Sequence, residues 1–247
     1  MQINDSSYKK IENILIVQEL PVLFSHSCRT PTAHPLHIKL LPYFKEKNLN
    51  LLLDPFIVGE DVIVAMHRLN LNAVVFYVTT ESITSDACKI EIDTAKRINA
   101  PILVITDGTQ VPKKFQNRIF LNLFNLTNST HDQIFKELAL QIQVRARIHA
   151  IINWLKMPER TVEEREYGIM WLYSQHSQIL AEFLKQIASL YHENEDNIVC
   201  HWLAQVLART ELPEACLYLQ QWWAQNDHPF ARNGLNHAMQ LLGCKSP

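Results

Sequence analysis

The chain of 247 residues can build a sizeable core, because 47% of its residues are hydrophobic and only 19% are charged. This composition argues against a disordered protein, and a formal net charge of -2 gives no general attraction to nucleic acid or anionic membranes. The N-terminal stretch MQINDSSYKK lacks the apolar core of a signal peptide, and no apolar run approaches the roughly 18 residues that a membrane helix needs.

The cysteines bear on location and on metal binding. Five are present, an odd number, widely spaced and without a CxxC pair: Cys28, Cys88, Cys200, Cys216 and Cys244. This pattern argues against a disulfide framework and against a zinc site. We therefore predict a reducing, cytoplasmic location and no metal in the functional site.

Up to about residue 125, short apolar runs alternate with helical patterns. The runs predict strands at 21–25, 49–54, 73–78, 101–106 and 119–124, and the patterns between them predict helices at 36–47, 61–69 and 86–99. The runs are almost continuously apolar, which is typical of parallel strands covered on both faces. We therefore expect a doubly wound α/β sheet, which binds ligands beyond the carboxyl ends of its strands.

From about residue 129 onward the pattern is entirely helical. A long amphipathic helix is predicted at 130–157, and further helices follow at roughly 161–175, 178–192, 195–209, 212–225 and 229–242. Paired helices of this size resemble HEAT-type repeats, whose period is about 40 residues, and an irregular helical bundle is the open alternative. The predicted domains are residues 1–145, an α/β domain, and residues 146–247, an α-helical domain that is HEAT-like or a bundle.

The stretch SDACKIEIDTAKRI, residues 85–98, contains a carboxylate in an unusual position. Cys88, Ile92 and Ala95 recur at helical spacing and form an apolar stripe, and Glu91 lies on the edge of that stripe. Ser85 is suited to cap the start of this helix. Because desolvating a carboxylate is costly, Glu91 either faces a ligand pocket or reaches water, or pairs with Lys96 or an arginine.

Two other polar stretches follow predicted strands. FSHS ends the first strand, and DPFIVGEDV follows the second, with Asp54 and Gly59 in a predicted loop. Small hydroxyl residues at a strand end either form an ordinary turn or donate hydrogen bonds to a ligand at that edge of the sheet.

In their order and spacing these stretches resemble the TIR domain family. VLFSHS resembles the end of the family's first strand, LLLDPFIVGEDV its BB loop, and SDACKIE the segment that opens its third main helix. The resemblance covers roughly residues 20–140. It implies a flavodoxin-like fold with five parallel strands.

The resemblance also implies an activity, because some TIR domains cleave NAD at its nicotinamide–ribose bond. Their essential glutamate corresponds to Glu91, which is the predicted catalytic residue. The predicted substrate-binding residues are Phe24, Ser25, His26, Asp54, Phe56, Ser85 and Cys88. The resemblance implies NAD as the substrate, no separate cofactor and no metal.

Three functions remain open at this stage. The first is an NAD hydrolase that is activated by self-assembly in a defence or cell-death signalling system. The second is a catalytically silent TIR adaptor, favoured by Ala87, which stands where the family has tryptophan. The third is an N-glycosidase that removes a different base.

The predicted partners are NAD and further copies of the chain, joined through both domains. A protein or a nucleotide signal is a further possible partner, whereas membrane and nucleic acid are not expected. Neighbours on a helix point about 100° apart, so Trp222 and Trp223 cannot both face one core. We therefore expect at least one of them to be partly exposed or at a contact, and residues from about 160 onward to form the assembly surface.

Overall fold

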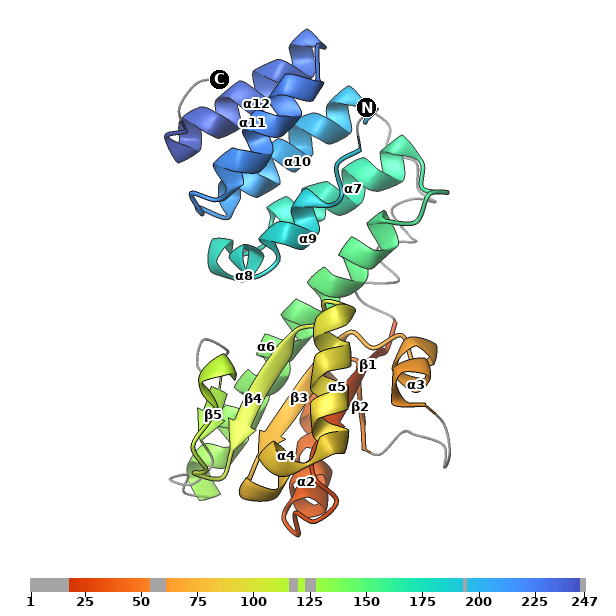
Figure 1. Cartoon of the computed structure of the whole chain (residues 1–247), viewed down its shortest axis with the longest axis vertical. Helices are drawn as coiled ribbons and strands as arrows, with labels where there is room; N and C mark the ends of the chain where they lie inside the picture. Colours follow the sequence, from red (N-terminus) through yellow and green to blue (C-terminus); the bar gives the residue numbers. More distant parts are fainter. Residues whose placement is uncertain (1–17, 54–60, 116–119, 123–127, 193–194, 245–247) are drawn as a thin grey trace. The chain divides into compact units, whose positions relative to one another are not determined.

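The computed structural model describes residues 18–53, 61–115, 120–122, 128–192 and 195–244, and it comprises two compact units (Figure 1). The α/β unit ends at Ala150, and the helical unit begins at Ile151. The division falls five residues beyond the predicted boundary of 145/146. Its cause is the burial of Ile142 and Ala146 in the core beneath the sheet, which assigns this part of the long helix to the α/β unit.

The α/β unit contains a five-stranded, all-parallel sheet with the strand order β2-β1-β3-β4-β5. Its strands are β1 (Leu20–Ser25), β2 (Leu49–Leu52), β3 (Ala73–Val78), β4 (Ile102–Thr106) and β5 (Phe120–Asn122). All five strands were predicted from their apolar runs. The prediction of a parallel α/β sheet followed by helices is confirmed.

Helices cover both faces of this sheet (Figure 1). They are α2 (Ala33–Glu46), α3 (Val62–Arg68), α4 (Thr80–Thr84), α5 (Asp86–Arg97) and the first part of α6 (Asn128–Leu155), with a short 3-10 helix η2 at Lys113–Phe115. The sequence did not predict α4. Its sequence TESIT is rich in β-branched and hydroxyl residues, but Thr79 and Ser82 cap each other's backbone N–H groups and close this single turn.

The side chains of the strands point alternately to the two faces of the sheet, and each face has its own hydrophobic core. Val22, Phe24, Val75 and Tyr77 pack with α2 and α6, on what we call the α2 face of the sheet. Leu23, Val74, Phe76 and Val78 pack with α3 and α5, on the α5 face. Successive side chains of a strand point to opposite faces, so neighbouring residues such as Phe24 and Ser25 belong to different sides of the sheet.

The helical unit contains α7 (Val162–Tyr173), α8 (Ser177–Ala181), α9 (Leu184–Ala188), α10 (Asn197–Arg209), α11 (Ala215–Gln225) and α12 (Pro229–Leu242). Helix α10 lies at its centre and packs against α7, α9, α11 and α12. The helix predicted at 178–192 is two short helices. They are separated at Phe183, where the backbone leaves helical geometry (φ -107°, ψ 9°) and the ring is buried.

Arg165 holds three parts of the helical unit together. Its guanidinium donates to the carbonyl oxygens of Leu155 (3.1 Å) and Leu190 (2.8 Å) and forms an ion pair with Glu195. The side chains of Arg165 and Glu195 are both buried. Burial raises the pKa of the Glu195 carboxyl, although the nearby Arg165 charge opposes this rise.

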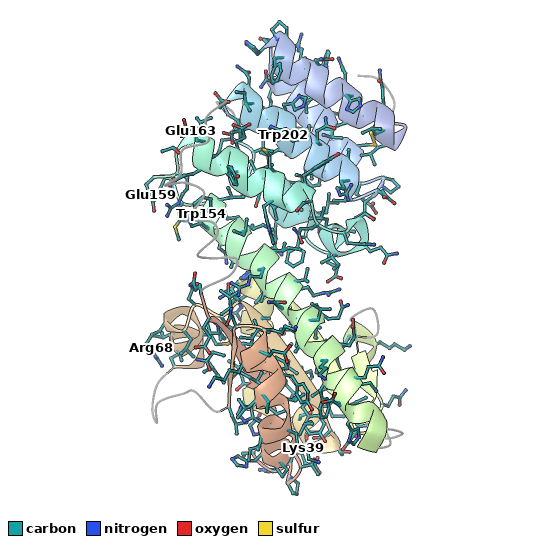
Figure 2. The ribbon with its side chains drawn as sticks, turned by 180° about the vertical axis from the view of Figure 1, so that it is seen from behind. Lys39, Arg68, Trp154, Glu159, Glu163 and Trp202 are labelled. Carbon is teal, nitrogen blue, oxygen red and sulfur yellow. A yellow bond between two sulfur atoms is a disulfide. The ribbon has the colours of Figure 1, made fainter. Side chains whose placement is uncertain are left out.

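The tryptophan pair of α11 behaves as predicted. Trp222 is buried and stacks on Tyr191, with ring centroids 4.6 Å apart, whereas Trp223 is partly exposed beneath the guanidinium of Arg232, 4.4 Å from its ring. Two further tryptophans, Trp154 and Trp202, are labelled in Figure 2. Each has an aromatic or cationic neighbour: Arg160 lies 4.8 Å from the Trp154 ring, and Tyr173 meets Trp202 edge-on.

One expectation about the cysteines is wrong. Cys216, at the start of α11, and Cys244, just after α12, form a disulfide with their Cα atoms 5.6 Å apart. They are 28 residues apart in sequence, and the packing of α11 against α12 brings them together. Spacing along the chain therefore did not reveal the pair. Cys28, Cys88 and Cys200 are free thiols.

Within the part of the chain that the structure describes, no helix is both long enough and apolar enough to cross a membrane.

Candidate functional site

The candidate site lies where the strand order reverses. From β1 the chain crosses to β2 on one side, and β3 then pairs with β1 on the other side. In open α/β sheets this reversal leaves a crevice at the carboxyl ends of the strands, where ligands bind. Ser25 is the last residue of β1, so it lies at this crevice.

Helix α5 brings the predicted catalytic carboxylate to the same place. The Ser85 hydroxyl accepts a hydrogen bond from the Cys88 backbone N–H (3.4 Å) and caps the helix, as predicted. Cys88, Ile92 and Ala95 are buried against the α5 face of the sheet. Glu91 shares their side of the helix and is only 7% exposed.

Ser25 and Glu91 meet although 66 residues separate them. The Ser25 hydroxyl, on a residue that is 1% exposed, donates a hydrogen bond of 2.6 Å to Oε2 of Glu91. Such a short O–H···O⁻ contact is typical of a hydrogen bond to an ionised carboxylate. The interpretation in which Glu91 reaches water is wrong, because the residue is buried. The Lys96 ammonium, which was considered as a partner of Glu91, forms an ion pair with Asp93 (3.1 Å).

Cys88 completes the immediate surroundings of this pair. Burial raises the pKa of the Cys88 thiol, and the Glu91 carboxylate raises it further, while the Ser85 and Ser25 hydroxyls oppose the rise. A raised pKa makes a thiol a poorer nucleophile, and Cys88 is packed in the core of the α5 face.

A small pocket opens beside Cys88. It is lined by Phe76, Ser82, Ile83, Cys88, Lys89, Ile92, Pro112 and Phe115. Its volume of about 30 Å³ accommodates a water molecule or two. This volume is far too small for a dinucleotide.

The side chain of Phe24 lies on the opposite face of the sheet from that of Ser25, and the His26 ring is beside it. The Phe24 ring is buried on the α2 face, where its neighbours include the rings of His37 (5.7 Å) and Tyr77 (6.1 Å). The His26 ring is 5.7 Å from Phe24, and its Nδ1 lies 3.3 Å from the Phe24 carbonyl oxygen. The structure thus brings Ser25, Ser85, Cys88 and Glu91 together, whereas the Phe24 ring is in the core of the α2 face with the His26 ring beside it. Asp54 and Phe56 lie outside the described residues.

Further polar groups that were not predicted lie at this edge of the sheet. The hydroxyls of Thr30 and Thr79, which follow β1 and β3, are 2.9 Å apart, and the Thr32 hydroxyl lies 3.0 Å from the Tyr77 hydroxyl. Burial raises the pKa of Tyr77. The sequence does show hydroxyl residues after both strands. Their spacing along the chain does not reveal which of them contact each other.

Within the described residues, no three or more histidine, cysteine, aspartate or glutamate side chains are grouped so that they could hold a metal ion. Comparison of the chain with protein-family models, with curated proteins and with solved structures returned no match.

Proposed function

We propose that the chain is a TIR-type NAD glycohydrolase that cleaves the nicotinamide–ribose bond, with Glu91 as the catalytic residue. The observation that carries the proposal is the buried Glu91 carboxylate, hydrogen-bonded by Ser25 at the carboxyl end of β1. An ionisable group that is buried beside a ligand crevice costs stability, and such groups are concentrated at functional sites.

The arrangement of the strands supports the family assignment. The order β2-β1-β3-β4-β5 corresponds to 2-1-3-4-5, the order of flavodoxin-like sheets, which bind ligands at the switch point between the first and third strands. Fold does not determine function, so this argument supports the location of the site and not the reaction.

One carboxylate suffices for the proposed chemistry. The nicotinamide of NAD carries a positive charge and leaves as a neutral base, so that no general acid has to protonate it. Positive charge then develops on the ribose in an oxocarbenium-like transition state, as in glycoside hydrolysis. The Glu91 carboxylate would stabilise this charge in a site that is largely shielded from water.

The test is to incubate the purified full chain with NAD and to measure released nicotinamide by chromatography. We expect release by the wild-type chain and its loss in Glu91→Gln. The matched control is Asp93→Asn, on the same helix, whose carboxylate is exposed and pairs with Lys96. Wild-type turnover in Glu91→Gln would refute the catalytic assignment.

A silent adaptor is the second candidate function, and the exposed side of α5 favours it. Ile90 is 46% exposed and Ala87 is also exposed, next to the buried row that contains Glu91. An exposed apolar side chain of this kind suits a protein contact. Absence of nicotinamide release at high protein concentration, together with loss of self-association in Ile90→Lys, would favour the adaptor.

The proposal includes a setting for the enzyme. We propose that it acts in a defence or cell-death signalling system and that self-assembly activates it. The helical unit would contribute to assembly or bind a protein or nucleotide signal. Light scattering across a concentration series, with turnover measured on the same samples, tests whether specific activity rises with oligomer size.

A further inference from the structure

The hydrogen bond between Ser25 and Glu91 assigns Ser25 a different task from the one that its position at a strand end predicts. Ser25 was predicted to be among the residues that touch substrate. A serine hydroxyl has one proton to donate, and in the structure this proton is directed to Oε2 of Glu91 at 2.6 Å. Ser25 is therefore not a hydrogen-bond donor to a ligand in this arrangement.

We propose that Ser25 is the positioning residue of Glu91: it fixes the catalytic carboxylate in orientation and keeps it ionised, without contacting the substrate. This inference rests on the proposed function. It names a residue that acts through Glu91 and leaves the substrate-contacting role to other groups of the crevice.

The surroundings of the pair make this positioning effective. Ser25 is the last residue of a strand paired on both sides, with β2 through earlier residues and with Phe76 of β3 opposite Ser25 itself. Its rotamer is confined by burial, since the residue is 1% exposed. Glu91 lies on a helix that is anchored on the sheet by Cys88, Ile92 and Ala95. A donor and an acceptor on two packed elements hold each other in one geometry, as a preorganised site requires.

The hydroxyl also counteracts the cost of burial. A carboxylate withdrawn from water favours its neutral, protonated form unless hydrogen bonds stabilise the charge. A donor that points at the carboxylate oxygen stabilises the anion, and only the anion can stabilise positive charge on the ribose. Removing the hydroxyl should therefore lower the rate of the chemical step and leave substrate affinity largely unchanged.

The first experiment measures kcat and KM for NAD cleavage in the full chain. For Ser25→Ala we expect kcat to fall about 10- to 100-fold, as when a partner that orients a functional group is removed, with KM changed by no more than about two-fold. Ser25→Thr retains a hydroxyl and should recover most of kcat. Thr210→Val is the matched control, because it removes a buried hydroxyl of the helical unit that donates to the Leu207 carbonyl oxygen (2.7 Å), and it should leave both constants near wild type.

The outcomes separate the possible roles of Ser25. A rise in KM at unchanged kcat in Ser25→Ala would mean that Ser25 binds substrate directly, and it would overturn the proposal. Unchanged kcat and KM with reduced stability would mean that the hydrogen bond only joins β1 to α5, and this would overturn it too. If Ser25→Ala does not fold, kcat and KM are measured for Ser25→Cys instead, which preserves the volume of the side chain. The same criteria then apply.

A double-mutant cycle tests the pair without using activity. Denaturant unfolding is measured for wild type, Ser25→Ala, Glu91→Ala and the double variant. Ser25→Ala should raise the unfolding equilibrium constant several-fold when Glu91 is present and clearly less in the Glu91→Ala background. If wild type releases no nicotinamide, the proposed function fails, and the cycle alone decides whether Ser25 holds Glu91. Strict additivity in the cycle would overturn the positioning role.

Discussion

The two units of the molecule each contain a buried carboxylate, and the partners of the two carboxylates differ. Glu195 in the helical unit forms an ion pair with Arg165, which also binds two backbone carbonyl groups. Glu91 in the α/β unit accepts a hydrogen bond from the neutral hydroxyl of Ser25, at the edge of the sheet. Burial alone therefore does not identify a functional acid, and the chemical nature of the partner is the more informative property.

The difference has a physical basis. A guanidinium neutralises the carboxylate and joins three segments of chain, an arrangement suited to holding a fold together. A hydroxyl stabilises the carboxylate by a hydrogen bond and brings no charge of its own, an arrangement suited to a carboxylate that acts on a cationic group. If the two carboxylates differ in this way, substitutions at Glu195 and its partner should affect stability more than substitutions at Glu91.

The largest effect on stability is expected for Arg165→Met. The substitution leaves the Glu195 carboxylate buried without its cation and removes hydrogen bonds to the Leu155 and Leu190 carbonyl oxygens. Breaking a buried ion pair from one side costs about 3–5 kcal/mol. Urea unfolding of the full chain measures the change. The control, Lys136→Met, removes an exposed ion pair with Asp132 and should leave the unfolding midpoint nearly unchanged.

The next largest effect is expected for Gly234→Ala in α12. A Cβ at this position would lie 2.9 Å from the His201 ring carbon Cγ and 3.1 Å from the His201 Cα, so α10 and α12 would have to separate. Overpacking of this kind costs about 1–3 kcal/mol. Asn233→Ala, on the exposed side of the same helix, is the control. Equal unfolding midpoints for the two variants would show that the α10–α12 contact tolerates an extra methyl group.

A third prediction compares the two carboxylates directly. Glu91→Gln should change the free energy of unfolding by about 1 kcal/mol or less, because the amide oxygen can still accept the Ser25 hydrogen bond. Glu195→Gln should cost more, because the buried Arg165 charge then loses its counter-ion. The two variants are compared in one urea series. A larger loss of unfolding free energy for Glu91→Gln than for Glu195→Gln would mean that Glu91 is the structural carboxylate, and it would reverse the comparison.

The sequence was most informative about local structure. The five apolar runs predicted the five strands, and the Ser85 cap with the stripe of Cys88, Ile92 and Ala95 predicted α5 and the burial beside Glu91. These features depend on residues that are close together in the chain. Long-range pairs were not predicted, because neither the contact of Ser25 with Glu91 nor the Cys216–Cys244 disulfide leaves a local pattern.

One mismatch arose at the end of β1, where a simple rule of strand geometry applies. Phe24, Ser25 and His26 were assigned together to the substrate, although adjacent residues of a strand point to opposite faces. Phe24 accordingly lies in the core of the α2 face, while Ser25 points to α5. Period-two alternation, extended to the last residues of the strand, is enough to separate Phe24 from Ser25 on the basis of sequence.

The smallest effect concerns pH, and it should be confined to the helical unit. Burial lowers the pKa of His201 in α10, and the neighbouring His237 of α12 lowers it further. His237 in turn faces the Gln205 side chain, with its Nδ1 3.1 Å from the Gln205 Oε1. Protonation of His201 is thus disfavoured in the folded chain.

The sign of the pH effect follows from this lowered pKa. In the unfolded chain His201 titrates near its ordinary pKa of about 6.5, so at slightly acidic pH the unfolded chain binds a proton that the folded chain does not. Stability is therefore fully present above about pH 6.5 and declines as the pH falls toward the folded pKa. His201→Phe preserves a ring beside Phe230 and Trp202 but cannot titrate. The drop in Tm between pH 7.5 and 5.5 should be smaller in this variant than in wild type, whereas His176→Gln, at an exposed histidine, should keep the wild-type drop. An equal drop in all three proteins would mean that His201 takes up its proton as readily in the folded chain as in the unfolded chain.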